Sequence, residues 1–484
     1  MSVFARATSL FSRAARTRAA DEAARSRSRW VTLVFLAVLQ LLIAVDVTVV
    51  NIALPAIRDS FHVDTRQLTW VVTGYTVVGG GLLMVGGRIA DLFGRRRTLL
   101  FGAFLFGASS LAAGLAPNLE LLVLARFGQG AGEALSLPAA MSLIALLFPE
   151  TAARSKALSV WASVASVGLV LGFLLSGVIT QLFSWRWIFL INIPLVSLVL
   201  VAVLLLVKKD ETTARNPVDL PGALLFTAAP LLLIFGVIEL GEDEPRLPLA
   251  VGSLLAAAVC AAAFVAVERR TAHPLVPLTF FGNRVRLVAN GATVLLSAAL
   301  STSFFLLTMH LQEERDLSPI EAGLSFLPLA LSLILASLLV PRLIERIGTT
   351  GAAVLGMALA ALGIGCFALL PSDNSLLTSV FPGMILLACG MATGLVALQN
   401  AALHAVTEAD AGVASGVQRC ADQLGGASGI AVYVSIGFSP HLGGDWDPFT
   451  VAYSLAGIGL IAAVLAVLAL SPDRRLAAPR EQED

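Results

Sequence analysis

The stretch Gly86-Gly87-Arg88-Ile89-Ala90-Asp91-Leu92-Phe93-Gly94-Arg95-Arg96-Arg97 separates two long apolar segments of the chain. A connection this short must reverse the chain sharply, and Gly87 and Gly94 permit backbone angles and close approaches that a side chain would block. Three consecutive arginines cross a bilayer only at high cost, so we expect them on the cytoplasmic side of a membrane. Every other segment can be counted outward from this turn.

The composition is that of a membrane protein. Apolar residues make up 57% of the 484 residues and charged residues 13%, and long apolar stretches recur along nearly the whole chain. A stretch of about 20 apolar residues crosses the roughly 30 Å hydrocarbon core of a bilayer as one helix. The predicted fold class is therefore an all-α membrane protein.

Fourteen membrane-spanning segments are predicted. They cover residues 30–56, 68–90, 98–116, 118–148, 155–182, 186–207, 218–240, 247–267, 284–311, 319–341, 351–370, 374–400, 411–438 and 449–471. Alternate connections are basic, such as Lys208-Lys209, and most of the others are acidic, such as Glu242-Asp243-Glu244. This alternation follows the positive-inside rule and predicts that both termini are cytoplasmic. The arginine-rich segment 1–29 is typical of a targeting peptide or of a disordered cytoplasmic tail, and its acidic pair Asp21-Glu22 favours the tail.

The chain contains an internal repeat. Gly128 and Gly132 of the fourth segment recur as Gly390 and Gly394 of the twelfth, and the turn at 341–348 is an imperfect copy of the opening stretch. Two six-helix halves with an inserted helix pair would explain both matches, and many secondary transporters are built from such repeats. The predicted domains are a cytoplasmic tail (1–29), an N-terminal half (30–207), an inserted two-helix segment with linkers (208–283), a C-terminal half (284–471) and a second tail (472–484).

The opening stretch resembles the loop signature between the second and third helices of the major facilitator superfamily. Further stretches are similar to its fourteen-helix drug:proton antiporter branch, the EmrB/QacA type, and they lie at 46–55, 126–130, 185–194, 219–222 and 273–275. The resemblance implies proton-coupled export of drugs or other bulky apolar or cationic compounds across the inner membrane by alternating access. It also implies that Asp91 and Arg95, with Gly87 and Gly94, form a cytoplasmic gate between the halves. The alternative is that Asp91 only caps its own turn.

Asp46 is the sharpest candidate for proton coupling. A carboxylate at mid-bilayer costs about 2.5–3.5 kcal/mol on insertion scales, so it needs a partner or a wet cavity. Asp46 lies nine residues before Pro55 on an outward-running segment, and Arg126 lies eight residues after Asn118 on an inward-running one. The two charges therefore lie at similar depth and can pair. A carboxyl group that switches between this pair and a drier pocket can carry one proton per cycle. A static salt bridge is the alternative.

Two further acids lie inside predicted spans. Glu133 follows Arg126 by seven residues, which is two turns along the same helix face. We interpret Glu133 as a second protonatable or cation-attracting site, and its neutralisation by Arg126 or by water is the alternative. Asp422 is the third proton-coupling candidate. It lies three residues after Arg419, and a self-contained ion pair between these two is favoured.

The fifth segment resembles the antiporter signature of the same family through Gly168, Gly172 and Gly177, although Phe173 and Ser176 replace an expected proline and glycine. Small residues four apart let helices approach closely, so a general packing face is the alternative. Polar or aromatic residues at a depth suited to a substrate cavity are Gln40, Gln129, Trp161, Asn290, Gln399 and Asn400.

No enzyme signature is found in the sequence, neither His-Glu-x-x-His nor a phosphate-cradling glycine-rich loop. The four cysteines lie inside apolar segments, so no metal site and no cofactor are predicted. The expected partners are a small-molecule substrate, protons and bilayer lipid but no nucleic acid, and the monomer is the expected functional unit. A proton-coupled importer, a lipid or metabolite exporter and a non-transporting membrane sensor remain alternatives, because a fold does not determine a substrate.

Overall fold

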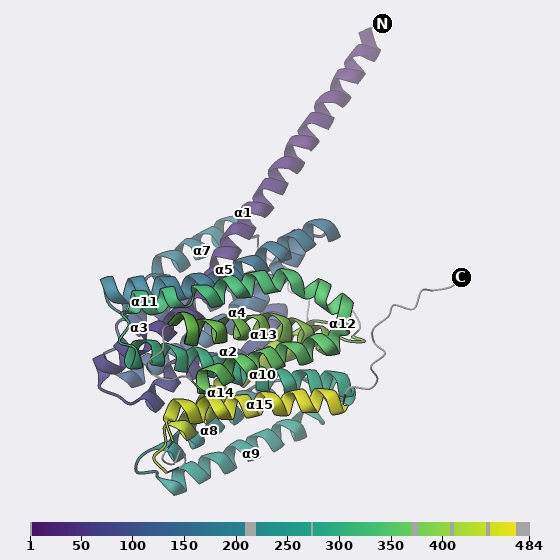
Figure 1. The fold of residues 1–484 in the computed structure, drawn as a ribbon. Coiled ribbons are helices and arrows are strands. Elements are labelled where there is room, and N and C mark those ends of the chain that lie inside the picture. Colours follow the sequence, from purple (N-terminus) through teal and green to yellow (C-terminus); the bar gives the residue numbers. More distant parts are fainter. Residues whose placement is uncertain are drawn as a thin grey trace.

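The computed structural model describes residues 2–208, 219–272, 274–369, 376–406, 411–441 and 446–470, and every regular element in these ranges is a helix. The helices lie side by side in one bundle, and α1 extends beyond it at the N-terminus (Figure 1). They are α1 (Ser2–Phe61), α2 (Thr65–Phe93), α3 (Arg95–Gly114), α4 (Leu119–Leu147), α5 (Thr151–Leu182), α6 (Trp187–Leu190), α7 (Asn192–Leu206), α8 (Leu220–Gly241), α9 (Leu247–Glu268), η1 (Leu278–Gly282), α10 (Arg284–Met309), η2 (His310–Glu314), α11 (Pro319–Ser325), α12 (Leu327–Ala368), α13 (Leu376–Ala402), α14 (Ala411–Gly437) and α15 (Pro448–Leu470).

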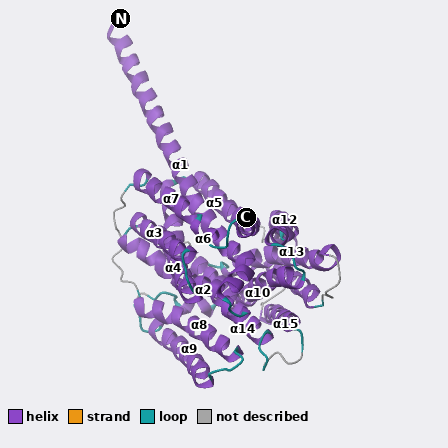
Figure 2. Cartoon of the chain, turned by 90° about the vertical axis from the view of Figure 1, so that its left-hand side faces the viewer, coloured by secondary structure: helices purple, strands orange, loops and turns teal. Residues whose placement is uncertain are grey.

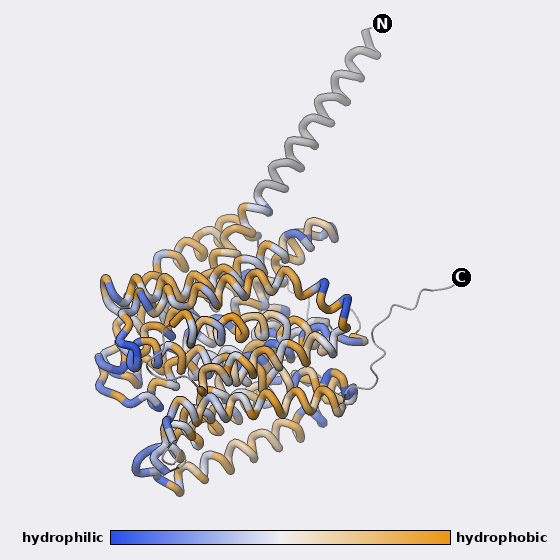
Figure 3. Tube along the Cα trace, in the orientation of Figure 1, coloured by the Kyte–Doolittle hydropathy of each residue, from blue (hydrophilic) through white to orange (hydrophobic). Residues whose placement is uncertain are grey.

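Twelve helices in the described ranges are long and apolar enough to cross a membrane. Their apolar lengths run together through the bundle, and hydrophilic residues gather at its two ends (Figure 3). The stretch Pro319–Ala368 counts once among the twelve, and α14, which carries Arg419 and Asp422, is not among them. An all-helical, multi-pass membrane fold is therefore confirmed, whereas the predicted number of fourteen spans is not.

Most helix ends agree with the predicted segments to within a few residues, but α1 starts far earlier than predicted, α12 runs through the predicted break at 342–350, and two segments are broken. The segment at 186–207 is divided into α6 and α7, and the one at 319–341 is divided between α11 and α12. The chain is helical from Ser2, whereas the sequence predicts a disordered tail over 1–29. Alanine and arginine, which dominate this segment, are strong helix formers. The predicted tail at 472–484 and His273 lie outside the described residues.

The glycine repeat is a repeat of helix packing. A Cβ atom placed on Gly132 of α4 would lie 2.8 Å from the carbonyl oxygen of Gly102 on α3. In the same way, a Cβ atom on Gly390 of α13 would lie 2.6 Å from the carbonyl oxygen of Gly356 on α12. Glycine at these crossings lets two backbones touch. We call α1 to α7 the N-terminal group and α10 to α15 the C-terminal group, and Figure 2 shows the two groups in the view turned by 90°.

Helix α8 lies along the junction of these groups, below α2 in Figure 2, and α9 packs against α8. Helix α8 packs against α2 of the N-terminal group and against α14 of the C-terminal group. Val77, Ile234, Ile238, Ala427 and Ala431 from these three helices form one buried apolar cluster. Helix α8 therefore covers the junction between α2 and α14, and α9 lies against α8.

The turn at Gly94, within the stretch 86–97, joins α2 to α3. Gly94 has φ 94°, and Gly348 has φ 74° at the corresponding turn of the C-terminal group, both in a region that other residues rarely adopt. Gly87 does not make the predicted close approach, because the nearest neighbour of a Cβ atom there would be 3.7 Å away. Gly86 makes it instead, since its Cβ atom would overlap the carbonyl group of Ala134 on α4. We call the end of the bundle that holds this turn the Gly94 end.

Candidate functional site

Asp46 of α1 and Arg126 of α4 form a buried ion pair. The Asp46 side chain is 0% exposed and that of Arg126 is 1% exposed, and an Arg126 Nη atom donates to Asp46 Oδ2. Counting residues along the two helices predicts this contact, because the rise per residue fixes the depth of each charge. Removing either partner would leave the other charge buried and uncompensated.

Amide and hydroxyl groups complete the surroundings of the pair. Asp46 Oδ1 accepts hydrogen bonds from Gln129 Nε2 at 3.0 Å and from Asn192 Nδ2 at 3.2 Å. The Gln129 amide also donates to Ser110 Oγ at 2.8 Å. Ser110 and Asn192 are not among the predicted site residues, although an asparagine within the apolar run 187–206 is a usable signal.

The Arg126 guanidinium is likewise fully engaged. Its Nε donates to the carbonyl oxygen of Val71 at 2.9 Å, and its Nη donates to Gln129 Oε1 at 2.9 Å. Its central carbon lies 4.2 Å from the ring centroid of Tyr75, a cation–π contact. Gln129 is therefore part of this network, which differs from its predicted place in a substrate cavity wall.

Glu133 occupies a second buried position, two turns further along α4. It is 0% exposed, and its Oε1 accepts a hydrogen bond from Gln423 Nε2 at 2.9 Å. Gln423 belongs to α14, so this hydrogen bond joins the N-terminal and C-terminal groups. Glu133 makes no ion pair within 4.0 Å in the described chain, and Arg126 pairs with Asp46 instead of neutralising it. Gln423 is not among the residues predicted for the site.

The predicted pair between Asp422 and Arg419 is not formed. The described residues contain no ion pair that joins them, and Asp422 Oδ1 accepts a hydrogen bond from Ser297 Oγ of α10 at 2.6 Å. The Arg419 side chain is exposed. Residues three apart on a helix can meet, but neighbouring helices decide whether they do.

Asp91 and Arg95 lie at the Gly94 end. Asp91 Oδ1 and an Arg95 Nη atom are 3.5 Å apart, and both side chains are partly exposed. Asp91 does not cap α3, because the N-terminal cap of that helix is Gly94. Close to this turn, Val85 of α2 packs in an apolar cluster with Ala414 and Val417 of α14, which joins the two groups there.

The glycines of α5 serve two different neighbours. A Cβ atom on Gly168 would lie 2.6 Å from the Ala44 side chain, and one on Gly172 would lie 3.0 Å from the carbonyl oxygen of Val45, so both face α1. A Cβ atom on Gly177 would lie 2.5 Å from the carbonyl oxygen of Pro319, at the start of α11. Gly177 therefore allows α5 to contact the C-terminal group.

Several contacts close the two groups at the end opposite Gly94. Arg58 forms an ion pair with Glu313 at 2.5 Å, and the Gln312 amide donates to the carbonyl oxygen of Ile52 at 2.9 Å. The rings of Phe173 and Phe326 stack at 4.3 Å between centroids. These contacts join α1 and α5 to the segments that follow α10.

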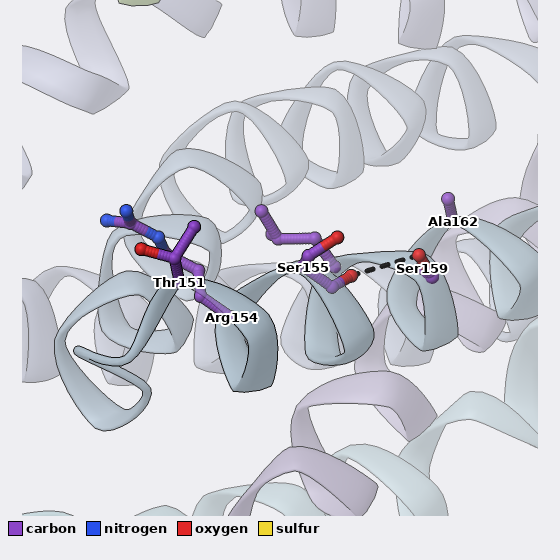
Figure 4. Close-up of a pocket in the computed structure, with 6 residues that line it drawn as sticks. Thr151, Arg154, Ser155, Ser159 and Ala162 are labelled. Carbon is purple, nitrogen blue, oxygen red and sulfur yellow. Dashed lines mark hydrogen bonds between the residues drawn. The ribbon is translucent and has the colours of Figure 1, made fainter.

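Helices α5 and α12 expose long faces toward the Gly94 end. A cavity of about 440 Å³ lies along α5 and is lined mainly by polar residues, Thr151, Arg154, Ser155 and Ser159 among them (Figure 4). A second cavity of about 650 Å³ follows α12, where Leu335 and Leu339 are exposed. Serines on an exposed helix face are not typical of a surface that meets lipid tails.

The remaining residues predicted for a cavity do not gather in one place. Gln40 is buried, and its side-chain oxygen has no hydrogen-bond partner in the described chain. Trp161 belongs to the packed apolar core of the N-terminal group. The Asn290 amide donates to the carbonyl oxygen of Arg286 on its own helix at 2.8 Å. Gln399 and Asn400 are exposed at the Gly94 end of α13.

Comparisons with known proteins agree with this architecture. The model of the Major Facilitator Superfamily matches residues 36–430. The solved peptide transporter POT is 15% identical, with a TM-score of 0.68 over 90% of this chain and 94% of its own. The nucleoside transporter NupG is 12% identical, with a TM-score of 0.65 over 91% of this chain and 99% of its own. At these identities the likeness shows the fold alone.

Proteins related in sequence are more informative about function than the solved structures are. The lincomycin resistance protein of Streptomyces lincolnensis is 94% identical over all 484 residues of both chains. The puromycin resistance protein pur8 of Streptomyces alboniger is 36% identical over 90% of each chain. The cephamycin export protein CmcT of Amycolatopsis lactamdurans is 36% identical over 89% of each chain.

Proposed function

We propose, from the premise that this chain belongs to the Major Facilitator Superfamily, that it exports lincomycin or a closely related antibiotic from the cell in exchange for protons. The protein is a membrane transporter of the drug-efflux type and not an enzyme. The observation that carries the choice of substrate is the 94% identity to a lincomycin resistance protein along the entire chain. The 36% identity to a puromycin and to a cephamycin relative supports antibiotic efflux as the wider class.

Proton exchange is proposed from the buried charges. Asp46 and Arg126 form an ion pair within the spans of α1 and α4. A charged carboxylate inside a membrane span is energetically costly, so its presence there indicates a functional role. In the proposed cycle a proton from outside neutralises Asp46, the pair with Arg126 loosens, and the substrate leaves on the outer side. A proton that crosses a membrane potential of about 100 mV supplies roughly 2.3 kcal/mol from its charge alone.

The proposed orientation places the Gly94 end and both termini in the cytoplasm. Its support is the gathering of Arg95, Arg96 and Arg97 at that end, according to the positive-inside rule. The contacts between the groups at the opposite end, and the exposed polar face of α5 at the Gly94 end, then correspond to an inward-facing state. In this proposal Asp91 and Arg95 act as a cytoplasmic latch when the protein closes on that side.

We also propose the fourteen-helix drug:proton antiporter branch and the predicted division into two halves with an inserted pair. The bend at Gly348 divides Pro319–Ala368 into two lengths that can each span a bilayer. Helix α14 has 27 residues, which suffices for another span in spite of its polar residues. The packing of α8 at the junction of α2 and α14, with α9 against α8, supports the inserted pair.

The test is transport of radiolabelled lincomycin into inside-out membrane vesicles that contain the protein. An imposed gradient with an acidic vesicle interior should drive accumulation several-fold above vesicles without the protein, and a protonophore should abolish it. Puromycin in parallel shows whether the substrate range is wider. Accumulation that needs ATP, or that is absent in the presence of folded protein, would contradict the proposal.

A further inference from the structure

The contact between Glu133 and Gln423 leaves two buried oxygen atoms without partners. Glu133 Oε1 accepts from Gln423 Nε2 at 2.9 Å, whereas Glu133 Oε2 and Gln423 Oε1 have no hydrogen-bond partner in the described chain. Both free oxygens face one small space, because a Cβ atom placed on Gly79 would lie 3.2 Å from Oε2 of Glu133 and 3.4 Å from Oε1 of Gln423. Two buried acceptors without a donor are costly.

One proton on the Glu133 carboxyl group can satisfy both atoms. A protonated carboxyl group has one donor and one acceptor, and a primary amide offers the complementary pair, so the two groups can form two parallel hydrogen bonds. We propose that Glu133 is a neutral carboxylic acid in this conformation, and that Gln423 is the positioning residue that holds the protonated form across the two helix groups. Exchanging the amide nitrogen and oxygen of Gln423 leaves the conclusion unchanged, because the amide oxygen then faces the other carboxyl oxygen.

The charged and titratable groups around Glu133 agree with a neutral carboxyl. Arg126 of α4 is engaged by Asp46 of α1, so that pair leaves no cation for Glu133. On α14, Arg419 lies near enough to act electrostatically on Glu133, but it makes no ion pair with it within 4.0 Å, and its side chain is exposed. On α2, the buried hydroxyl of Tyr75 lies close enough to the Glu133 carboxyl to donate to it, although the two groups fall short of the geometry of a formed hydrogen bond. Tyr75 is therefore the rival donor to Oε2.

Glycines on α2 make the contact possible. A Cβ atom on Gly80 would lie 2.9 Å from the Cβ atom of Gln423, and the Cys420 thiol donates to the carbonyl oxygen of Gly80 at 3.1 Å. The two helices therefore touch where Gln423 reaches past α2 to α4. Loss of the proton removes one of the two hydrogen bonds and leaves a charge at this seam, which loosens α14 from the N-terminal group. The protonated pair thus acts as a proton-dependent clasp. Its part in transport rests on the proposed proton exchange, whereas the protonation itself does not.

Infrared difference spectroscopy of the full-length protein in lipid tests the protonation. The carbonyl stretch of a neutral carboxylic acid should be present at pH 7 and should vanish in Glu133→Gln. It should shift in Gln423→Leu, which removes the amide. Gln418→Leu is the matched control, because Gln418 is a buried amide on the same helix that donates to Thr293 within its own group at 2.7 Å. That variant should leave the band unchanged.

Three outcomes would overturn the proposal. They are the absence of a Glu133-dependent band, a band that Gln418→Leu shifts as much as Gln423→Leu does, and a band that responds to Tyr75→Phe but not to Gln423→Leu. The last result would assign Tyr75 as the partner of the carboxyl group.

Spin labels at Met84→Cys and Gly416→Cys, in a background without the native cysteines, test the clasp. These positions face each other across α2 and α14, since a Cβ atom on Gly416 would lie 3.4 Å from the Met84 side chain. The distance between the labels should increase on raising the pH in the otherwise native protein, and should stay constant in Glu133→Gln, which retains an amide pair at every pH. A pH response that persists in Glu133→Gln would contradict the clasp. Proton-independent transport with an intact infrared band would instead refute only the proposed proton exchange.

Discussion

The energy of the pair between Asp46 and Arg126 can be measured with a double-mutant cycle. Asp46→Asn leaves a guanidinium that is 1% exposed without a counterion, and Arg126→Gln leaves a carboxylate that is 0% exposed in the same position. Removing one partner of a buried pair costs about 3–5 kcal/mol, mostly because the remaining charge is uncompensated. The double variant contains two neutral amides and no buried charge, so its loss should be at least about 2 kcal/mol smaller than the sum of the single losses.

The free energy of unfolding is measured by titrating the protein in mixed micelles with a denaturing detergent. Arg186→Gln is the matched control, since Arg186 donates to the carbonyl oxygens of Gly114 and Ala116 and to no carboxylate in the described chain. Its effect should add to that of Asp46→Asn to within about 0.5 kcal/mol. If the effects of Asp46→Asn and Arg126→Gln add equally well, the two side chains do not stabilise the protein as a pair and the reasoning is refuted.

Three further predictions concern the backbone and the closed end. Gly86→Ala should lower the free energy of unfolding by about 1–3 kcal/mol or more, because the added methyl group overlaps a carbonyl group of α4, whereas Gly87→Ala should fold normally. Equal yields of monodisperse protein for the two variants would contradict this assignment. Gly348→Ala should cost about 1–3 kcal/mol in the same detergent titration because of its φ of 74°, and an unchanged stability would show that the turn relaxes freely. Arg58→Glu should favour opening at the end opposite Gly94, which is measured as faster chemical labelling of a cysteine introduced there. The double variant with Glu313→Arg reverses the ion pair and should restore slow labelling. Fast labelling of the double variant would exclude this ion pair as a closing contact.

The depth of a residue in the membrane can be predicted from the sequence, and its direction around the helix axis cannot. Counting from the ends of two segments places Asp46 opposite Arg126, because each residue advances a helix by about 1.5 Å. Gly94 is found in the same way, from its place between two apolar runs, and its positive φ follows from the sharp turn.

The incorrect predictions share a physical cause. Helices that are apolar on all sides give no amphipathic signal for the face that meets a neighbour. The sequence therefore predicts Gly87 as the close contact where Gly86 makes it, and pairs Asp422 with Arg419 where Ser297 is its partner. Trp161, expected at a cavity, is buried in the apolar core of the N-terminal group, and its part in a substrate cavity stays a prediction.

Contacts between the N-terminal and C-terminal groups cannot be predicted from the sequence, because they depend on how the helices pack. Gln423 reaches Glu133 across 290 positions of the chain, and only the packing of α14 on the glycines of α2 brings them together. A single glutamine in a polar stretch of α14 gives no sign of such a partner. The same holds for Ser110 and Asn192, whose roles depend on three helices meeting at Asp46.

The central claim is that Asp46 carries the proton exchanged for the drug. The most direct measurement is the release of protons from detergent-purified protein on addition of lincomycin, read with a pH indicator in weakly buffered solution, together with drug binding measured on the same sample. Wild-type protein is expected to release protons on binding the drug, whereas Asp46→Asn should bind the drug and lose the proton release from this site. Undiminished proton release in folded, drug-binding Asp46→Asn protein would contradict it.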